Sequence, residues 1–356
     1  MERVIVGMSG GVDSAVAAYL LKREGYDVTG VTLRTWVSDE GEEGRCCEID
    51  DARRAAAAIG IPYHVFNCTS DFKKCVIDPF VDDYLHGLTP NPCVICNRLI
   101  KWERMLNTAD ILKADLVATG HYARLVRLDN GRYTVRQAGH TEKDQTYMLY
   151  RLTQDQLART LMPLGDLTKD EVRRIADEAG IPVADKPDSQ EICFIPDDDH
   201  AGYIEHNHPQ DLPGQGDFVD EDGRILGRHK GIIHYTVGQR KGLGLPLGYP
   251  AYVKKIDVVK NEVVISRNEA LFNRTVICRD INLMSIPCIN EGDELRCRAR
   301  IRYHHIPQDA VVSAAGDGMI RILFDEPVRA AAPGQSAVMY DEDDNVIGGG
   351  IIHEVM

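Results

Sequence analysis

A glycine-rich loop between an apolar strand and an apolar helix constrains the fold of this chain more than any other feature. Residues 3–8 read Arg-Val-Ile-Val-Gly-Met, which is typical of a buried strand. The loop Ser9-Gly10-Gly11-Val12-Asp13-Ser14 follows, and the apolar residues 14–22 predict a helix. Since the loop lies at the helix N-terminus, its N–H groups and the helix dipole favour a bound anion. The unit therefore predicts a parallel α/β sheet with a phosphate site at one edge.

The same loop argues against two common nucleotide sites. No Lys-Ser or Lys-Thr pair follows the glycines, which argues against a Walker loop for γ-phosphate transfer. No GxGxxG motif is present to bind a dinucleotide. A capped turn, with Asp13 or Ser14 as the N-cap, is the alternative to a phosphate site.

Strands and helices alternate through the first part of the chain and give way to short strands later. Further strands are predicted near 27–34, 62–67 and 115–119, and helices near 49–59, 153–161 and 168–179. Beyond about residue 210, short alternating strands separated by Gly, Pro, Asn and Asp predict a β-rich part. At ~150 residues per domain, a chain of 356 residues has room for two or three domains.

Composition limits the partners and the compartment. The chain has 41 Lys and Arg against 55 Asp and Glu, a net charge of -14, so any RNA contact must use a local basic patch. No uncharged apolar run approaches the ~18 residues that cross a bilayer, and we expect no contact with a membrane. The first residues lack the features of a secretion signal, so we expect a cytoplasmic protein.

The cysteines form candidate reactive sites. Ten cysteines are too sparse for a disulfide scaffold, and in a reducing compartment clustered cysteines indicate metal binding or catalysis. Cys93 and Cys96 form a C-x-x-C motif before a predicted helix at 98–106, whose N-terminus would lower the pKa of a thiol. Cys193 is a third candidate, although each cysteine alone is more often a small buried hydrophobe. The adjacent pair at 46–47 is expected to be structural or simply exposed.

A run of basic residues near the C-terminus is the best candidate for a phosphate-binding patch. In a strand over 296–304, side chains alternate between faces, so the basic ones share one face. These are Arg296, Arg298, Arg300, Arg302 and His304. Like charges repel unless an anion covers them, so we expect contact with RNA phosphates rather than a solvated barrel face.

Two other polar segments have ordinary structural explanations. Residues 143–145, Lys-Asp-Gln, predict the start of a helix, where capping accounts for such residues. The acidic run at 197–199, which has histidines nearby, is expected to be a solvated face or a helix cap rather than a metal site.

These motifs together resemble those of a known family. The loop at 9–14 is similar to the signature loop of the PP-loop ATP pyrophosphatases, which split ATP between the α and β phosphates and adenylate a carbonyl oxygen. The chain as a whole resembles the tRNA-uridine 2-sulfurtransferases, the thiouridylases that thiolate the wobble uridine of certain tRNAs. The resemblance is carried by the loop and by the segments TPNPCVICN, ATGHYAR, KDQTYMLYRL, DSQEICFI, YTVGQRKGLG, RYHH and FDEPVRAAAPGQSAVMY.

The resemblance implies a fold and a cofactor. It implies an α/β fold class, with a PP-loop parallel sheet with helices over residues 1–205, a small β-rich central domain over 206–272 and a C-terminal β-barrel that binds tRNA over 273–356. It implies ATP with Mg²⁺ as cofactors and tRNA as substrate. The implied ATP-binding residues are Gly7, Met8, Ser9, Gly10, Gly11, Val12, Asp13, Ser14, Leu33 and Gly120.

The resemblance also assigns roles to the cysteines. Cys96 would be the nucleophile, and Cys193 would carry a persulfide that a sulfur donor protein supplies. Some family members have Asp where this chain has Cys93, so an alternative is a four-iron four-sulfur cluster held by Cys93, Cys96 and Cys193. The implied tRNA contacts are Asn91, Pro92, Cys93, His121, Lys143, Asp144, Gln145, Arg302, Tyr303 and Gln335.

Two rival functions remain at this point. Another PP-loop ligase or amidotransferase would need neither the cysteine pair nor a basic strand. A non-catalytic iron–sulfur regulator that binds RNA would need no ATP loop.

Overall fold

The computed structural model describes residues 1–37, 48–182, 192–195, 197 and 199–356, and its N-terminal part is built on a five-stranded parallel sheet. The sheet order is β3-β2-β1-β4-β7. Its strands are β1 (Arg3–Gly7), β2 (Asp27–Arg34), β3 (Tyr63–Asn67), β4 (Leu116–Ala118) and β7 (Thr160–Leu161). Because β1 pairs with β2 on one side and β4 on the other, the order reverses at β1, and ligands bind beyond the strand ends at such a point.

Helices cover both faces of this sheet because side chains alternate along β1. Val4 and Val6 pack in one cluster with residues of α1 (Val12–Arg23), α2 (Ile49–Ile59) and α8 (Lys169–Glu178). Ile5 points to the other face and packs with Met105 and Ala109 of α6 (Glu103–Leu112). The predicted α/β architecture is confirmed.

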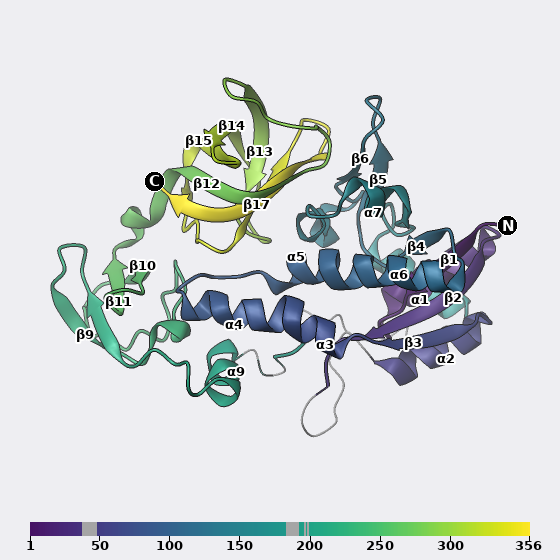
Figure 1. Ribbon diagram of the computed structural model, residues 1–356, viewed down its shortest axis with the longest axis horizontal. Helices are drawn as coiled ribbons and strands as arrows, with labels where there is room; N and C mark the ends of the chain where they lie inside the picture. Colours follow the sequence, from purple (N-terminus) through teal and green to yellow (C-terminus); the bar gives the residue numbers. More distant parts are fainter. Residues whose placement is uncertain (38–47, 183–191, 196, 198) are drawn as a thin grey trace.

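Two long helical segments run side by side from the sheet toward the far end of the molecule (Figure 1). One joins α3 (Thr69–Phe72), a π-helical stretch η1 (Lys73–Ile77) and α4 (Asp78–Leu85). The other joins α5 (Pro92–Cys96), a π-helical stretch η2 (Asn97–Trp102) and α6. The predicted helix at 98–106 therefore begins earlier, and Pro92 at its first position fits because proline lacks an N–H to donate there.

The segment after β4 is less helical than predicted. It forms the hairpin β5 (Arg124–Arg127) and β6 (Tyr133–Arg136), then the 3-10 turns η3 (Thr141–Lys143) and η4 (Thr146–Met148). The helix predicted to start at 143–145 is wrong, because the buried Asp144 carboxylate accepts hydrogen bonds from the backbone N–H groups of Ala138 and Thr146. The helix predicted at 153–161 is the shorter α7 (Gln154–Ala158).

The C-terminal half is β-rich, as predicted. After α9 (His200–Asn207), whose N-cap is Asp199, a four-stranded sheet has the order β10-β11-β8-β9. Its strands are β8 (Gly216–Val219), β9 (Ile225–His229), β10 (Tyr252–Asp257) and β11 (Glu262–Ser266), with the short turns η5 (Ile232–His234) and η6 (Asn268–Leu271). No helix in the described part of the chain is long and apolar enough to span a membrane.

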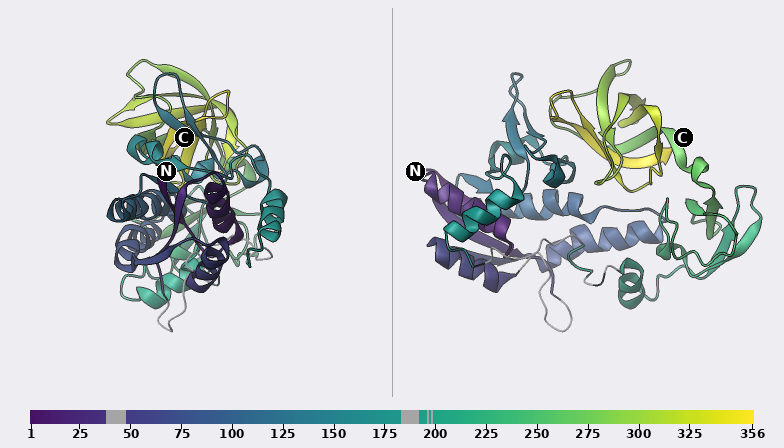
Figure 2. Two further views of the ribbon diagram at one scale, coloured as in Figure 1. Left: turned by 90° about the vertical axis from the view of Figure 1, so that its right-hand side faces the viewer. Right: turned by 180° about the vertical axis from the view of Figure 1, so that it is seen from behind.

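The chain ends in a closed six-stranded barrel with the order β12-β15-β14-β13-β16-β17. The strands are β12 (Phe272–Leu283), β13 (Glu294–Arg300), β14 (Gln308–Gly316), β15 (Met319–Arg329), β16 (Ser336–Tyr340) and β17 (Val346–Val355). Both the front and the rear views place the barrel on the same side of the long helical segments as the β5–β6 hairpin (Figure 2). Side chains of residues 133–152 pack against the barrel residues Val338, Tyr340 and Val346.

Candidate functional site

The loop at 9–14 is built to leave helix N–H groups available. Gly11 is the N-cap of α1 and provides no side-chain cap, so the predicted alternative of a turn capped by Asp13 or Ser14 is wrong. The Ser14 hydroxyl instead donates to the carbonyl of Gly11 at 3.1 Å and accepts from the N–H of Ser9 at 3.2 Å. Both contacts hold the loop in a tight turn around the start of α1, where the helix dipole favours an anion.

Two glycines of this site are required by close approach. Gly10 has a positive φ of 88°, and a Cβ there would lie 2.6 Å from the carbonyl oxygen of Glu48. A Cβ on Gly120, after β4, would lie 2.7 Å from the backbone of both Asp13 and Ser14. The end of β4 therefore lies directly against the loop, as the predicted pairing of Gly120 with the nucleotide site requires.

The remaining predicted ATP-binding residues surround the carboxyl ends of β1 and β2. Met8 is buried, its N–H donates to Val31 at 2.8 Å and its carbonyl accepts from the Thr32 hydroxyl at 2.6 Å. Gly7 is the last residue of β1 and packs against the Met105 side chain. Leu33, near the end of β2, is buried on the face of the sheet that packs against α6. Val12 is buried in the first turn of α1.

Asp13 has two side-chain partners that the sequence did not reveal. The ammonium of Lys169 donates to both of its carboxylate oxygens at 2.8 Å, and the hydroxyl of Tyr122 donates to one of them at 2.7 Å. Lys169 is the first residue of α8, a position that the helix dipole makes unfavourable for a cation. A lysine at the first position of a predicted helix was therefore the signal in the sequence that could have indicated this contact with Asp13.

Tyr122 also connects the loop to the predicted tRNA-binding residues. Its N–H donates to the side chain of Gln145, and the N–H of Gln145 donates to the Tyr122 carbonyl, both at 3.0 Å. The neighbouring His121 lies against the Trp102 ring, with centroids 5.3 Å apart. Burial, aided by the nearby charge of Lys101, holds the pKa of His121 well below its usual value, so this ring is neutral at physiological pH.

The cysteines differ in their surroundings. Cys96 is buried in a hydrophobic cluster that includes Phe194 and Ile195, and Cys193 packs against the same cluster. The structure thus brings the two predicted reactive thiols into one region, although they are distant in sequence. Cys46 and Cys47 lie outside the described residues.

Cys93 does not have the lowered pKa predicted from its place before a helix N-terminus. By surface area the residue is exposed, but the protein atoms that surround the sulfur displace water from it. This desolvation raises the pKa of Cys93, and the positive charge of Lys101 opposes the shift. Within the described residues, which include all three candidate thiols, no three His, Cys, Asp or Glu side chains converge as metal ligands. The predicted iron–sulfur ligand set is therefore not formed in this structure.

The barrel holds the segment that precedes Cys93. The side-chain amide of Gln335 donates to the carbonyls of Thr89 and Pro90, at 2.9 and 3.3 Å. A Cβ on Gly334 would lie 2.8 Å from the N–H of Thr89, so the turn before β16 fits closely against this segment. Farther along, the Asn91 amide contacts the sulfur of Met148 at 3.7 Å, next to the buried Pro92.

Asp144 joins the barrel to the segment at 143–145. Its side chain is 1% exposed and forms an ion pair with Arg300, at 3.4 Å, whose side chain is 12% exposed. The Tyr303 hydroxyl donates to the Asp144 carbonyl at 3.2 Å. The Asp144 carboxylate thus faces protein, and it fixes the positions of Lys143 and Gln145 on either side.

The continuous basic face predicted at 296–304 is wrong. β13 ends at Arg300, so Arg302 and His304 lie in the turn beyond the strand. The other arginines are neutralised within the protein, because Arg296 pairs with Asp325, Arg298 with Asp344 and Arg300 with Asp144. The anions that cover this face are therefore carboxylates of the chain itself, and the most distant in sequence, Asp144, lies 156 residues from its partner Arg300.

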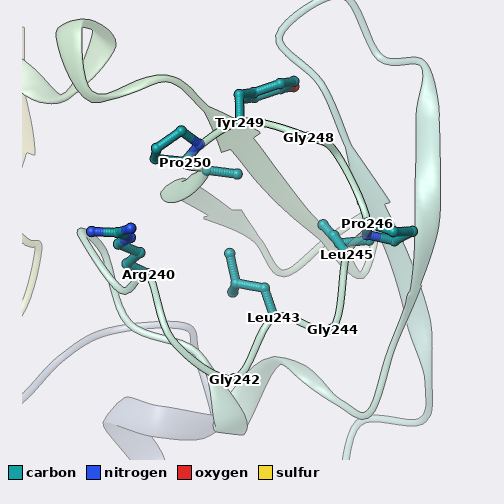
Figure 3. Close-up of a pocket in the computed structure, with 10 residues that line it drawn as sticks. Arg240, Gly242, Leu243, Gly244, Leu245, Pro246, Gly248, Tyr249 and Pro250 are labelled. Carbon is teal, nitrogen blue, oxygen red and sulfur yellow. The ribbon is translucent and has the colours of Figure 1, made fainter.

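A cavity of about 670 Å³ lies in the central β-rich part rather than at these residues (Figure 3). It is lined by Arg240 and by residues between Gly242 and Ala251, in the loop before β10. None of the predicted site residues lines it.

Comparison with known proteins identifies the family. The family model described as tRNA methyl transferase HUP domain matches residues 2–197. The models described as tRNA methyl transferase PRC-barrel domain and as aminomethyltransferase beta-barrel domain match residues 202–267 and 273–352.

Full-length relatives carry a thiouridylase name. The tRNA-specific 2-thiouridylase MnmA of Lachnoclostridium phytofermentans is 51% identical over 363 residues, which cover 99% of each chain. Its counterpart in Clostridioides difficile is 50% identical over 99% of this chain and 98% of its own. That of Clostridium perfringens is 49% identical over 100% of this chain and 99% of its own.

A solved structure, the U34-tRNA thiolase NcsA from Methanococcus maripaludis with its 4Fe-4S cluster, matches 59% of this chain and 67% of its own. Its TM-score of 0.36 and identity of 21% are too low to bear on the fold or the cofactor. The full-length relatives are decisive, and the chain belongs to the tRNA-specific 2-thiouridylase family of the PP-loop superfamily.

Proposed function

We propose that this chain catalyses ATP-dependent thiolation of the C2 position of the wobble uridine in tRNA. The observation that carries the proposal is a chain of contacts that joins the phosphate loop to the predicted RNA-binding segments. The Asp13 carboxylate accepts a hydrogen bond from the Tyr122 hydroxyl, and the Tyr122 N–H donates to the side chain of Gln145. Asp144, the residue before Gln145, contacts Arg300 in the barrel and Tyr303 in the turn after it. ATP and the base would thus meet at the carboxyl end of β1.

The first step is adenylation of the base. The loop Ser9–Ser14 would bind the phosphates through the N–H groups at the start of α1, with Leu33 and Gly120 next to the adenosine. Mg²⁺ would be held by Asp13 and by the phosphates of ATP, because Mg²⁺ sites commonly combine one or two carboxylates with substrate phosphates. A carbonyl oxygen is a poor leaving group, and linking it to AMP makes its displacement by sulfur feasible.

The second step transfers sulfur. The terminal sulfur of a Cys193 persulfide attacks C2, and the C2–O bond breaks as AMP leaves with its electron pair. The Cys96 thiolate then attacks the Cys193 sulfur, the S–S bond to the transferred sulfur breaks, and thiouridine is released. The two cysteines are left oxidised as a Cys96–Cys193 disulfide, which an external dithiol reduces. A persulfide donor protein in the cytoplasm would reload Cys193.

A second candidate route uses a four-iron four-sulfur cluster held by Cys93, Cys96 and Cys193. The arrangement of the thiols argues against it, since they do not converge as ligands among the described residues. The Cys93→Ala variant distinguishes the two routes. If the persulfide route holds, this variant should keep substantial activity in iron-free enzyme. Loss of activity together with loss of iron in anaerobically purified protein would favour the cluster.

The proposal is tested with ATP, unmodified tRNA and a persulfide donor. We expect pyrophosphate release that depends on tRNA, and 2-thiouridine in the nucleosides analysed by mass spectrometry. Asp13→Ala should abolish pyrophosphate release and leave tRNA affinity nearly intact, because Asp13 lies at the nucleotide loop. Pyrophosphate release that needs a small carboxylate instead of tRNA would favour a PP-loop ligase, and tRNA binding without any ATP cleavage would favour a regulator.

A further inference from the structure

The cavity in the central β-rich part is formed by a loop whose backbone is open to solvent. Residues 240–251 make up this central loop, which lies before β10 and folds around the cavity of about 670 Å³ (Figure 3). Gly242, Gly244 and Gly248 have positive φ values of 79°, 65° and 72°. A Cβ on Gly244 or Gly248 would meet no atom of the described residues within 4 Å. The path of the loop therefore requires these glycines, and the space beside them is open.

The N–H groups of these three glycines are not used to hold the loop together. Among the described residues, no backbone or side-chain acceptor pairs with the N–H of Gly242, Gly244 or Gly248. Backbone N–H groups around left-handed residues form concave sites that bind anions, phosphate among them. The central loop thus offers neutral donors of the kind that bind a phosphate group.

Three cations gather at the same loop. Arg240 and Lys241 are exposed, and neither side chain forms an ion pair or a hydrogen bond within the described part of the chain. The guanidinium carbon of Arg267 lies 4.3 Å from the centroid of the Tyr249 ring, and Tyr249 lines the cavity. In a protein with a net charge of -14, cations that gather at one open loop create a local site for an anion.

The central loop is distant from the place proposed for ATP and the base. Parallel strands have their carboxyl ends at one edge of the sheet, and residues 69–85 start at that edge, directly after β3. These residues form the segment from α3 to α4, which spans about 25 Å at a helical rise of about 1.5 Å per residue. Beyond its end, Gly87 lies against the Ile256 side chain of β10, and the central strands are at the opposite end of the molecule from the parallel sheet (Figure 1). An anion at the central loop is therefore remote from the reacting base.

We propose that the central loop binds backbone phosphates of the tRNA outside its anticodon stem and loop, an inference that rests on the proposed function. A tRNA is a polyanion that is much longer than its anticodon loop. When the wobble base reaches the edge of the sheet, the rest of the molecule extends along the protein. Arg, Lys and backbone N–H groups bind phosphates wherever they occur, and they position a nucleic acid without reading its sequence. The central loop therefore recognises the shape of a tRNA and orients its anticodon toward the cysteine motif.

An acidic surface on the persulfide donor protein is the other anion to consider. RNA is favoured because two features of the loop suit nucleotides together. Phosphate oxygens accept from the open N–H groups and from Arg240 and Lys241, and nucleobases stack on aromatic rings such as that of Tyr249. The two partners differ in one measurable property, the affinity of the enzyme for full-length tRNA in the absence of any donor protein.

The experiment compares the double variant Arg240→Ser/Lys241→Ser with a matched control, Arg228→Ser/Lys254→Ser. The control removes the same two residue types from the central sheet, where each is already paired with a carboxylate. Filter binding over a range of salt measures affinity for full-length unmodified tRNA and for its isolated anticodon stem–loop. We expect the first variant to bind full-length tRNA at least about tenfold more weakly and to reduce the slope of log affinity against log salt by about 2, as for two lost phosphate contacts. Its affinity for the stem–loop should stay within about twofold of the wild type.

The control should bind both RNAs within about threefold of the wild type, because the charges it removes are already paired. If the first variant melts at a lower temperature than the control, Arg240→Gln and Lys241→Gln are measured singly, and each should reduce the slope by about 1. An equal loss of affinity for the stem–loop would place the contact on the anticodon arm and overturn the inference. Wild-type affinity and slope would also overturn it, and slower sulfur transfer from the donor protein in such a variant would identify a protein-docking loop instead. Absence of tRNA binding by the wild type would overturn the proposed function.

Discussion

At the scale of single residues, the two cysteines of the proposed mechanism differ in burial. Cys193 is partly exposed, as a thiol that the proposed donor protein loads with sulfur needs to be. Cys96 is buried in the same hydrophobic cluster, where it is protected from external oxidants but close to the segment that carries Cys193. This division matches a mechanism in which one thiol is loaded from outside and the other acts within the protein.

Cys96→Ala and Cys193→Ala should each eliminate thiouridine while tRNA-dependent pyrophosphate release continues, because adenylation uses neither thiol. Cys75→Ala is the matched control, since Cys75 packs against the same cluster and has no assigned role. Both products are measured in one reaction, pyrophosphate by a coupled assay and thiouridine by mass spectrometry. Wild-type thiolation by either variant with a persulfide donor and no added sulfide would contradict the two-cysteine mechanism.

Cys93 should react slowly with iodoacetamide despite its exposure. Burial raises its pKa, so at neutral pH the thiolate fraction is smaller than in a free cysteine, whose pKa is ~8.5. Since the thiolate is the reactive form, the rate should rise with pH and reach half its maximum above that value. Lys101→Met removes the charge that opposes the shift and should move the midpoint higher still. Peptide mass spectrometry follows the rate, and a midpoint below that of free cysteine would indicate a helix-activated thiol instead.

At the scale of secondary structure, the sequence was informative where one periodicity dominated. The apolar run at 3–8 predicted β1, and the alternation of strands and helices along the chain predicted β2 near 27–34 and α2 near 49–59. The helix prediction for residues 143–148 was wrong because Asp144 sets their conformation, and its partner Arg300 lies 156 residues away. The same ion pair made the basic face of β13 unpredictable, since alternation identifies a face but not the elements that pack on it.

Arg300→Met should destabilise the contact between the barrel and the segment at 143–145. It leaves the Asp144 charge buried without a cation, and breaking a buried ion pair in this way costs about 3–5 kcal/mol of unfolding free energy. Arg296→Met is the control, because its pair with Asp325 is exposed to solvent and its loss should cost far less unfolding free energy than the loss of Arg300. Shifts in the urea unfolding midpoint measure both changes.

The pH dependence of the unfolding free energy of Arg300→Met tests whether the buried Asp144 charge causes the destabilisation. Burial raises the pKa of Asp144, and the loss of Arg300, whose charge lowers it, raises it further. Protonation removes the buried charge, so the destabilisation should be largest at neutral pH and should shrink as the pH falls. Adding Asp144→Asn should recover part of the lost stability at neutral pH. A destabilisation that is equal at all pH values would mean that lost packing of the arginine, not the buried charge, is responsible.

At the scale of the whole molecule, the predicted order of an α/β part, a β-rich part and a barrel was correct, but their assembly was not visible in the sequence. Gln335 reaches back to Thr89 and Pro90 from a position 245 residues or more away, and it supports the cysteine motif through backbone carbonyls. Such contacts use no recognisable motif, since any amide can donate to a carbonyl. The motifs therefore predicted candidate residues, while the contacts that hold their segments together are visible only in the structure.

The correction of the basic face leads to a prediction for tRNA binding by the whole protein. With a net charge of -14, the protein repels RNA at long range and must rely on the few cations that its own acids do not neutralise. Arg298 is paired with Asp344, whereas Arg302 lies in the turn beyond β13, next to Tyr303. Arg302→Ser should therefore weaken tRNA binding and reduce the slope of log affinity against log salt by about 1, as expected for one lost phosphate contact.

Arg298→Ser is a matched control for this measurement, because it changes the net charge by the same amount on the neighbouring part of the chain. Its salt slope should equal that of the wild type, because the charge of Arg298 is already paired with the carboxylate of Asp344. Filter binding from low to moderate salt, with cognate and non-cognate tRNA, gives both slopes. A phosphate contact acts on any tRNA, so the reduction for Arg302→Ser should be similar for the two. Equal slopes for both variants and the wild type would mean that the barrel turn makes no phosphate contact, and the search would move to Lys143 and to Arg98 and Lys101 on the long helical segment.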